Sequence, residues 1–426
     1  MEQRIPDADS EKSINFKSKL KIIGPGIILA ATGIGSGDLV TSTVAGADFG
    51  MVLAWAVIIG VSLKLLLSEG VARWTLATGK TILEGWRLLG RWTMGYFLIY
   101  VTLFGLIYGA AIATACGIMM HAMFPVMPIW AWAIIHSVAG FLLIWFGRYK
   151  IFERVIMVLI GTMFVTVVGS AIMLIPSLSN VSMEAFSLGI PDGSLFRILG
   201  IIGGIGGTLA LAAYGYWIRE KGWRDASWLP IMRLDVSVAY TMTGIFSVSL
   251  MIVSTQFLYG NSVSFDGAAG MLDFLYIYGE NFGSTPQFIL NIGFWAATCS
   301  SLIGSWNGIP YLFADFIRIM KKNKKKKELS QNSSGNPVSI KDPAYKFFLA
   351  WLTFPSLLLL MFNQPIGLVL LYAALGSAFI PFLAITLLYL LNSKYVTKQF
   401  KNNFFQNAAL VFVIIVFLTL GINEFM

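Results

Sequence analysis

The sequence predicts an all-α integral membrane protein, and three observations lead to that fold class. Asp, Glu, Lys and Arg make up 12% of the 426 residues, whereas a soluble domain has about 25%. Apolar and aromatic residues make up 57%, and mean hydropathy is +0.76. Eleven stretches hold the roughly 20 apolar residues that a membrane-spanning helix needs. This composition excludes an ordinary soluble enzyme, a disordered chain and a secreted disulfide scaffold.

The eleven predicted helices follow one another with mostly short connections. Their ranges are 22–48, 51–72, 93–123, 128–147, 152–176, 197–218, 234–258, 284–319, 345–363, 366–391 and 404–423. We expect residues 1–21 to form a cytoplasmic tail and residues 22–426 to form a single transmembrane domain. Residues 321–343 are expected to be a basic cytoplasmic loop between the eighth and ninth helices.

The basic residues predict how these helices are oriented. With the N-terminus inside, 28 of the 30 Lys and Arg residues fall in the tail or in cytoplasmic loops, and only Lys64 and Arg197 do not. The expected outer loops 177–196 and 259–283 are acidic. The positive-inside rule therefore predicts a cytoplasmic N-terminus and an extracytoplasmic C-terminus in the cell membrane. The net charge of +9 then reflects topology and contact with membrane lipids, and no nucleic-acid partner is expected.

Glycine clusters predict that the first and sixth helices are broken. The first reads GPGIILAATGIGSGDLVTSTVAG and the sixth reads ILGIIGGIGGTLALAAYGYWIREKG. An inverted repeat of five plus five helices makes these two helices equivalent. Because an interrupted helix is tolerated in a membrane where it lines a cavity, we expect a substrate site between the breaks.

Asp38 is the strongest candidate site residue, because a charged Asp at the centre of a spanning helix costs about 2.5–3.5 kcal/mol. It either binds a cation at an unwound stretch or makes a structural hydrogen bond. Five further residues are candidates for lining the pathway: Thr41, Tyr214, Ser300, Ser301 and Asn307. Small polar residues also serve close helix packing, which is the alternative role. Lys64 and Glu69 are expected to snorkel or pair near the cytoplasmic end of the second helix.

Several motifs resemble the Nramp divalent-metal transporters over most of the chain. They are Gly24-Pro25-Gly26, Ala45-Gly46-Ala47-Asp48-Phe49-Gly50, Glu69-Gly70-Val71-Ala72-Arg73, Thr78-Gly79-Lys80 with Glu84, Arg233-Leu234-Asp235, and Cys299-Ser300-Ser301 with Gly304. The resemblance implies a LeuT-like fold, with an inverted five-helix repeat and with helices 1 and 6 unwound. It also implies alternating access and a substrate site between the two unwound stretches.

The chain departs from this family at the implied site. The family's Asp-Pro-Gly-Asn motif falls on Gly35-Ser36-Gly37-Asp38, and its Met-Pro-His motif falls on Ala210-Leu211-Ala212-Ala213. The implied substrate or metal site is thus Asp38 with Gly35, Ser36, Ala210, Ala212 and Ala213. The acidic pair and histidines of the family's proton route fall near Ile107 and Ala110 and near Trp217 and Ile218.

These departures shape the expected function. A site with one carboxylate and backbone carbonyls suits a hard cation such as Mg²⁺ or Mn²⁺, carried without proton coupling and without a resident cofactor. The alternative is a LeuT-fold carrier of a non-metal small solute, such as an amino acid or organic ion. Arg219 supports that alternative, since it would repel a cation near the pathway unless Glu220 neutralises it. An enzyme is disfavoured because the sequence places no group of His, Asp and Glu at a span end.

Overall fold

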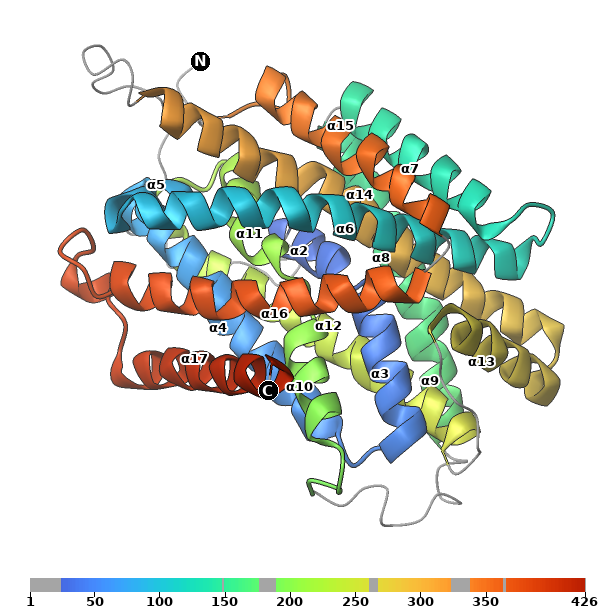
Figure 1. The fold of residues 1–426 in the computed structure, drawn as a ribbon. Coiled ribbons are helices and arrows are strands. Elements are labelled where there is room, and N and C mark those ends of the chain that lie inside the picture. The colour runs from blue at the N-terminus through green and yellow to red at the C-terminus, as the bar shows by residue number, and fades with distance from the viewer. Residues whose placement is uncertain are drawn as a thin grey trace, which may run out of the picture.

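The computed structural model describes residues 24–147, 149–175, 189–259, 267–322, 338–362 and 365–425. These residues form helices and connecting turns, with no strand among them. Figure 1 shows the helices packed into one bundle, with α2 (Pro25–Gly33) and α11 (Leu209–Glu220) in its interior. The expected tail at 1–21 and most of the expected loop at 321–343 lie outside the described residues.

The predicted spans correspond to helices in the same order. The first five are α2 with α3 (Ser36–Phe49), α4 (Ala54–Thr78), α6 (Arg91–Met123), α7 (Ile129–Phe146), and α8 (Tyr149–Met163), which continues through a π turn into α9 (Gly169–Leu174). The next five are α10 (Leu195–Gly204) with α11, α12 (Leu229–Leu258), α14 (Ser284–Lys322), α15 (Pro343–Leu358) and α16 (Pro365–Leu390), and α17 (Phe404–Phe425) follows. Between spans lie α5 (Ile82–Leu89), α13 (Gly267–Phe282) and short 3₁₀ turns at 226–228, 359–362 and 398–400.

The number of spans agrees with the sequence only in part. In the described residues eight helices are long and apolar enough to cross a membrane, or nine when α2 and α3 count as one span. Shorter apolar segments at Ala378–Leu390 and Phe404–Phe417 belong to α16 and α17. The count of eleven therefore stays a prediction.

The expected outer loop at 259–283 contains a helix, which the sequence interpretation missed. α13 buries Met271, Phe274, Leu275 and Tyr278 against the bundle. This spacing of three, four and seven residues gives one apolar face of a helix. The segment is too short and too polar to cross the membrane, so a search for long apolar stretches reads it as a loop.

Both predicted helix breaks are present, and glycine explains them. The axes of α2 and α3 differ by 57°, with the break at Ile34 and Gly35. Between α10 and α11, Gly206 and Gly207 have φ of +77° and +69°, the left-handed region that favours glycine. A Cβ on Gly33 would lie 2.8 Å from the Gly206 carbonyl oxygen. The two breaks therefore touch through their backbones.

Candidate functional site: the paired helix breaks

Asp38 joins the two breaks. Its side chain is fully buried, and Oδ2 accepts a hydrogen bond from the backbone N–H of Gly35 at 3.3 Å, at the start of α3. Oδ1 accepts from the N–H of Gly206 at 3.1 Å and from Ser247 Oγ of α12 at 3.4 Å. A carboxylate near a helix N-terminus is also favoured by the helix dipole. Of the two roles considered for Asp38, the structural hydrogen bond is therefore present.

Lys64 reaches the same break from α4, where the sequence interpretation expected it to snorkel or pair near a helix end. Its side chain is 1% exposed. Nζ donates to the carbonyl oxygen of Gly207 at 2.6 Å and to that of Gly203 at 3.1 Å. Lys64 and Asp38 also attract each other electrostatically. The ammonium group thus serves as a cation built into the broken helix.

Two predicted pathway residues stabilise the end of α2. Ser300 Oγ donates to the carbonyl oxygen of Ala31 at 3.0 Å, and Ser301 Oγ donates to that of Thr32 at 2.7 Å. The carbonyl groups at the end of a helix lack partners within the helix. Both serines therefore cap α2 from α14.

Of the other pathway candidates, Tyr214 and Asn307 make their contacts away from the breaks, whereas the Thr41 side chain lies against Gly204 at the end of α10. The Tyr214 hydroxyl donates to Asp235 Oδ2 at 2.7 Å, and Asn307 Oδ1 accepts from Trp217 Nε1 at 2.9 Å. Thr41 Oγ1 donates to the Gly37 carbonyl within its own helix at 2.8 Å. The bonds of Tyr214 and Asn307 hold α11 against α12 and α14.

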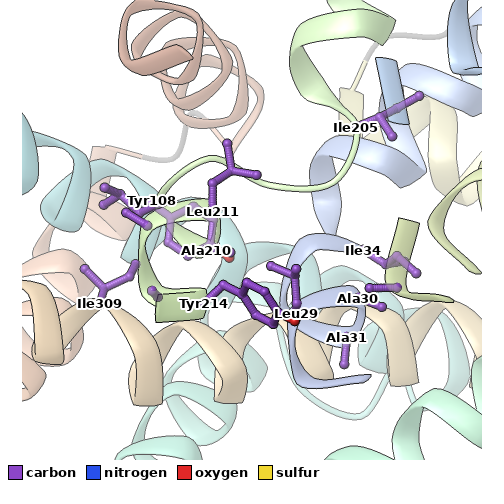
Figure 2. Close-up of a cluster of buried hydrophobic side chains, with 14 of the residues drawn as sticks. Leu29, Ala30, Ala31, Ile34, Tyr108, Ile205, Ala210, Leu211, Tyr214 and Ile309 are labelled. Carbon is purple, nitrogen blue, oxygen red and sulfur yellow. The ribbon is translucent and has the colours of Figure 1, made fainter. Parts of the chain in front are cut away.

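A small cavity of about 10 Å³, enough for about one water molecule, lies beside the first turn of α11. It is lined by Thr32 of α2, Phe104 and Tyr108 of α6, Gly207, Thr208, Leu209 and Ala210 at the break, Ser305 and Ile309 of α14, and Tyr372 of α16. Figure 2 shows Tyr108, Ala210 and Ile309 gathered at this turn. No side chain in this lining is charged, so the cavity wall is apolar and hydroxylic.

Only one of the predicted substrate residues, Ala210, lines this cavity. Gly35 packs directly against the side chain of Ser301. Ser36 Oγ is buried without a hydrogen-bond partner. Ala212 and Ala213 are buried in the hydrophobic core. The sequence interpretation placed Lys64 near a helix end and not at the breaks, and it did not name Thr208 or Tyr372. For Lys64 a signal was available, since it is one of only two basic residues outside the expected cytoplasmic segments.

The side chains at the paired breaks offer few ligands for a metal ion. Among the described residues there is no group of three His, Cys, Asp or Glu side chains that could hold one. The Cys116 and Cys299 thiols approach each other at 3.9 Å, but both are buried between α6 and α14. Asp38 is the single acidic side chain at the breaks, and its oxygens already accept hydrogen bonds.

Solved structures share this arrangement of helices. A manganese transporter of Eremococcus coleocola superposes with a TM-score of 0.75 at 17% identity, over 97% of this chain and 87% of the other. Mhp1, a transporter of the nucleobase-cation-symport-1 family, superposes at 0.56 with 15% identity over 94% and 90%. Together these likenesses establish a LeuT-like fold.

Sequence relatives point the same way. The chain is 24% identical to the divalent metal cation transporter MntH of Bacillus subtilis, over 61% of this chain and 63% of that protein. It is 24% identical to the metal transporter nramp1 homolog of Dictyostelium discoideum, over 74% and 61%. It is also 22% identical to the uncharacterized protein PM0681 of Pasteurella multocida, over 66% of each chain. The chain thus matches somewhat under two thirds of the length of each relative.

The family itself follows from a match over nearly the whole chain. The family model for natural resistance-associated macrophage protein-like sequences (Nramp) covers residues 26–426. This is a family of multi-pass membrane transporters and not of enzymes. The chain therefore belongs to the Nramp family.

Proposed function

We propose that this protein moves a small organic solute across the cell membrane, in preference to a divalent cation, and that the solute binds between the two helix breaks. The observation that carries this choice is the position of Lys64. Backbone carbonyls at an unwound helix are the groups that coordinate cations in transporters of this kind. Here the Lys64 ammonium occupies those of Gly203 and Gly207.

A fixed ammonium group opposes a divalent ion for electrostatic reasons. Two unit charges 4 Å apart repel each other by about 4 kcal/mol at an effective dielectric constant of 20, and a divalent ion doubles this. Asp38 offsets this repulsion, but the two charges together leave no net negative charge at the breaks to attract a divalent ion. Mg²⁺ and Mn²⁺ favour six oxygen ligands, and Asp38 is the only carboxylate at the breaks.

A divalent cation remains the second candidate, because two of the relatives are named as metal transporters. In that case Asp38 would have to exchange its bonds to Gly35 and Gly206 for the ion. The residues at the family's proton-route positions, including Ile107 and Trp217, are apolar or aromatic. They support transport without proton coupling by that route, whichever substrate is carried.

Alternating access fits the paired breaks, which allow the halves of each broken helix to move separately. The charged residues support the predicted orientation. Glu69 pairs with Arg73 and Arg233, and Glu84 pairs with Arg318, all at helix ends expected to face the cytoplasm. We propose that these ion pairs close that side when the cavity is open to the other side.

Purified protein in liposomes tests the choice between the two substrates. We expect no saturable uptake of Mn²⁺ or Mg²⁺, measured with a metal-sensitive dye inside the vesicles. In Lys64→Gln, which removes the charge but keeps a polar side chain, binding of Mn²⁺ measured by calorimetry should rise. Saturable Mn²⁺ uptake by the natural protein that is lost in Asp38→Asn would overturn the proposal.

A further inference from the structure

The loop between α16 and α17 (residues 391–403) is held against the end of α4. Arg73 of α4, whose side chain is 2% exposed, donates to the Phe400 carbonyl oxygen at 2.9 Å and to Asn402 Oδ1 at 2.7 Å. The N–H of Asn402 donates to the Leu391 carbonyl at 3.3 Å, and Val396 is buried. Figure 1 shows this loop at the same end of the bundle as α5. The α16–α17 loop is therefore a folded surface and not an open linker.

Four lysine side chains belong to this surface. Lys394, Lys398 and Lys401 are exposed residues of the loop. Lys80 reaches it from the turn between α4 and α5, with Nζ 5.3 Å from the centre of the Tyr395 ring. Lys394 Nζ lies 6.0 Å from the centre of the same ring. Two ammonium groups thus share one aromatic ring, which attracts cations through its π face.

These lysines lack acidic partners. None of the four forms an ion pair in the part of the chain that the structure describes. From Pro343 to Asn423 the sequence contains no Asp or Glu. Glu84, the acidic residue nearest to Lys80 along the chain, pairs with Arg318 instead. The surface therefore carries an excess of positive charge and favours an anion.

Exposed aromatic residues flank the loop on both helices. Tyr389 of α16 is 67% exposed, and Phe404 and Phe405 of α17 are each 80% exposed. Tyrosine is typical of the boundary between lipid headgroups and acyl chains, and phenylalanine is favoured within the hydrocarbon. We therefore expect the α16–α17 loop to lie at the depth of the headgroups.

We propose that this loop and Lys80 bind the headgroup of an anionic phospholipid of the expected cytoplasmic leaflet, with its acyl chains against Phe404 and Phe405. Basic residues beside a membrane attract anionic lipids. A soluble anion would use the lysines alone, so the adjacent exposed rings favour a lipid. Because Arg73 also pairs with Glu69, a lipid that holds the loop in place stabilises this buried ion pair as well. The proposal does not depend on which substrate is carried.

Thermal stability of the full-length protein in dodecyl maltoside tests the proposal at constant ionic strength. The probes are anionic phosphatidylglycerol, phosphatidylcholine without net charge, and glycerol phosphate without acyl chains. We expect only phosphatidylglycerol to raise the melting temperature in a saturable way. Equal stabilisation by phosphatidylcholine would show that charge plays no part, and equal stabilisation by glycerol phosphate would show that a soluble anion suffices. Either result, or no effect of any probe, overturns the proposal.

Substitution of the loop lysines locates the site. The triple variant Lys394→Gln, Lys398→Gln and Lys401→Gln should weaken phosphatidylglycerol binding about tenfold or more, since each basic residue near an anionic headgroup adds to the affinity. The affinity is taken from the lipid concentration at half of the full shift. The matched control removes the same charge from three exposed lysines elsewhere on the expected cytoplasmic surface, Lys150→Gln, Lys321→Gln and Lys341→Gln. It should retain the affinity, and equal losses in both triple variants would contradict a site in the loop.

A second pair of variants tests the contact with the acyl chains. Phe404→Ala with Phe405→Ala keeps every lysine and should also weaken phosphatidylglycerol binding, because apolar surface beside the headgroup is lost. The control is Phe146→Ala with Phe347→Ala, at two residues that are 76% and 60% exposed at helix ends expected on the same side of the membrane. This control should bind as the natural protein does. Unchanged binding in the Phe404 and Phe405 variant would contradict the assigned contact with a lipid.

Discussion

Asp38 and Lys64 hold opposite polar groups of the same broken helix. Asp38 accepts from the N–H of Gly206 at 3.1 Å, and Lys64 donates to the carbonyl of the next residue, Gly207, at 2.6 Å. Water cannot satisfy backbone groups at this depth in a membrane. The two side chains therefore replace the hydrogen bonds that the helix loses at its break. Their charges cancel, which limits the cost of placing them there.

Loss of Lys64 should destabilise the protein strongly. In Lys64→Met the carbonyls of Gly203 and Gly207 lose their donor, and Asp38 loses its counter-charge. Removing one partner of a buried pair costs about 3–5 kcal/mol. Scanning fluorimetry of the detergent-purified protein should show a large fall in melting temperature. Adding Asp38→Asn should recover part of it, and strictly additive losses would contradict the coupling.

An exposed ion pair provides the control for that experiment. Arg197 of α10 pairs with Asp48 of α3 at 3.1 Å, but their side chains are 45% and 34% exposed. Such pairs contribute about 1 kcal/mol or less. Arg197→Met should therefore change the melting temperature little, although it also removes one positive charge.

The left-handed backbone at the second break should not tolerate a side chain. Gly206 has φ of +77°, and a Cβ there would also approach the Tyr240 ring at 3.1 Å. The left-handed conformation alone costs a non-glycine residue about 1–2 kcal/mol. Gly206→Ala should lower the melting temperature and reduce substrate affinity, because the position of Gly207 and the start of α11 depends on this turn.

Gly200→Ala serves as the control for that substitution. Gly200 lies within α10, and a Cβ there would meet no atom within 4 Å. Alanine is favoured over glycine by about 1 kcal/mol inside a helix. This variant should be as stable as the natural protein or more so. A similar loss in both variants would show that the bundle tolerates no added methyl group in this region.

The sequence predicts the broken helices well because glycine acts locally. Gly206 and Gly207 adopt backbone angles that other residues avoid, and this preference can be read without the fold. The membrane-spanning character of the helices is just as local, since it depends on runs of apolar residues. Asp38 stands out in the sequence for the same reason, being a charge among apolar neighbours, and it lies at the first break, while its role in binding stays a prediction.

Side-chain partners could not be predicted because they depend on how distant helices pack. Lys64 meets carbonyls more than 130 residues away in the sequence, at Gly203 and Gly207. Ser300 and Ser301 are polar residues inside a span, as expected of a pathway, yet they cap α2. Thr208 carries no distinguishing pattern in the sequence. It immediately precedes α11, in the N-cap position of that helix, and its side chain makes no cap hydrogen bond there.

Acid should weaken an ion pair at the expected cytoplasmic surface. Glu84 of α5 accepts a hydrogen bond from Arg318 of α14 at 2.8 Å. Burial acts to raise the pKa of Glu84, but the bonded Arg318 guanidinium outweighs it and holds that pKa below its ordinary value. A carboxyl group with a lowered pKa stabilises the fold above its ordinary pKa, and this contribution disappears as the pH falls through the lowered one.

The comparison of the natural protein with Glu84→Gln isolates this effect. At neutral pH the natural protein should be more stable by about 1 kcal/mol, because the pair is partly exposed. The difference in melting temperature should shrink as the pH is lowered below the ordinary range for glutamate. A difference that grows on acidification would contradict the assignment, since glutamine does not titrate.

Glu69 should be the most sensitive of the acidic residues at the expected cytoplasmic ends of the helices. Its two oxygens accept from Arg73 and Arg233, each at 3.0 Å, and so join α4 to α12. The side chains of Arg73 and Glu69 are 2% and 7% exposed. Glu69→Gln leaves the Arg73 charge buried without its counter-charge, a change that costs about 3–5 kcal/mol.

The matched control is Glu153→Gln, which breaks the partly exposed pair of Glu153 with Lys221 at 2.8 Å. We expect a much larger fall in melting temperature in Glu69→Gln than in Glu153→Gln. If the pair with Arg233 holds the expected cytoplasmic side closed, uptake kinetics should separate this role from stability. Arg233→Gln leaves the buried pair of Glu69 with Arg73 intact, so it should change the rate of substrate entry more than the melting temperature. An unchanged rate in that variant would restrict Glu69 to holding the fold together.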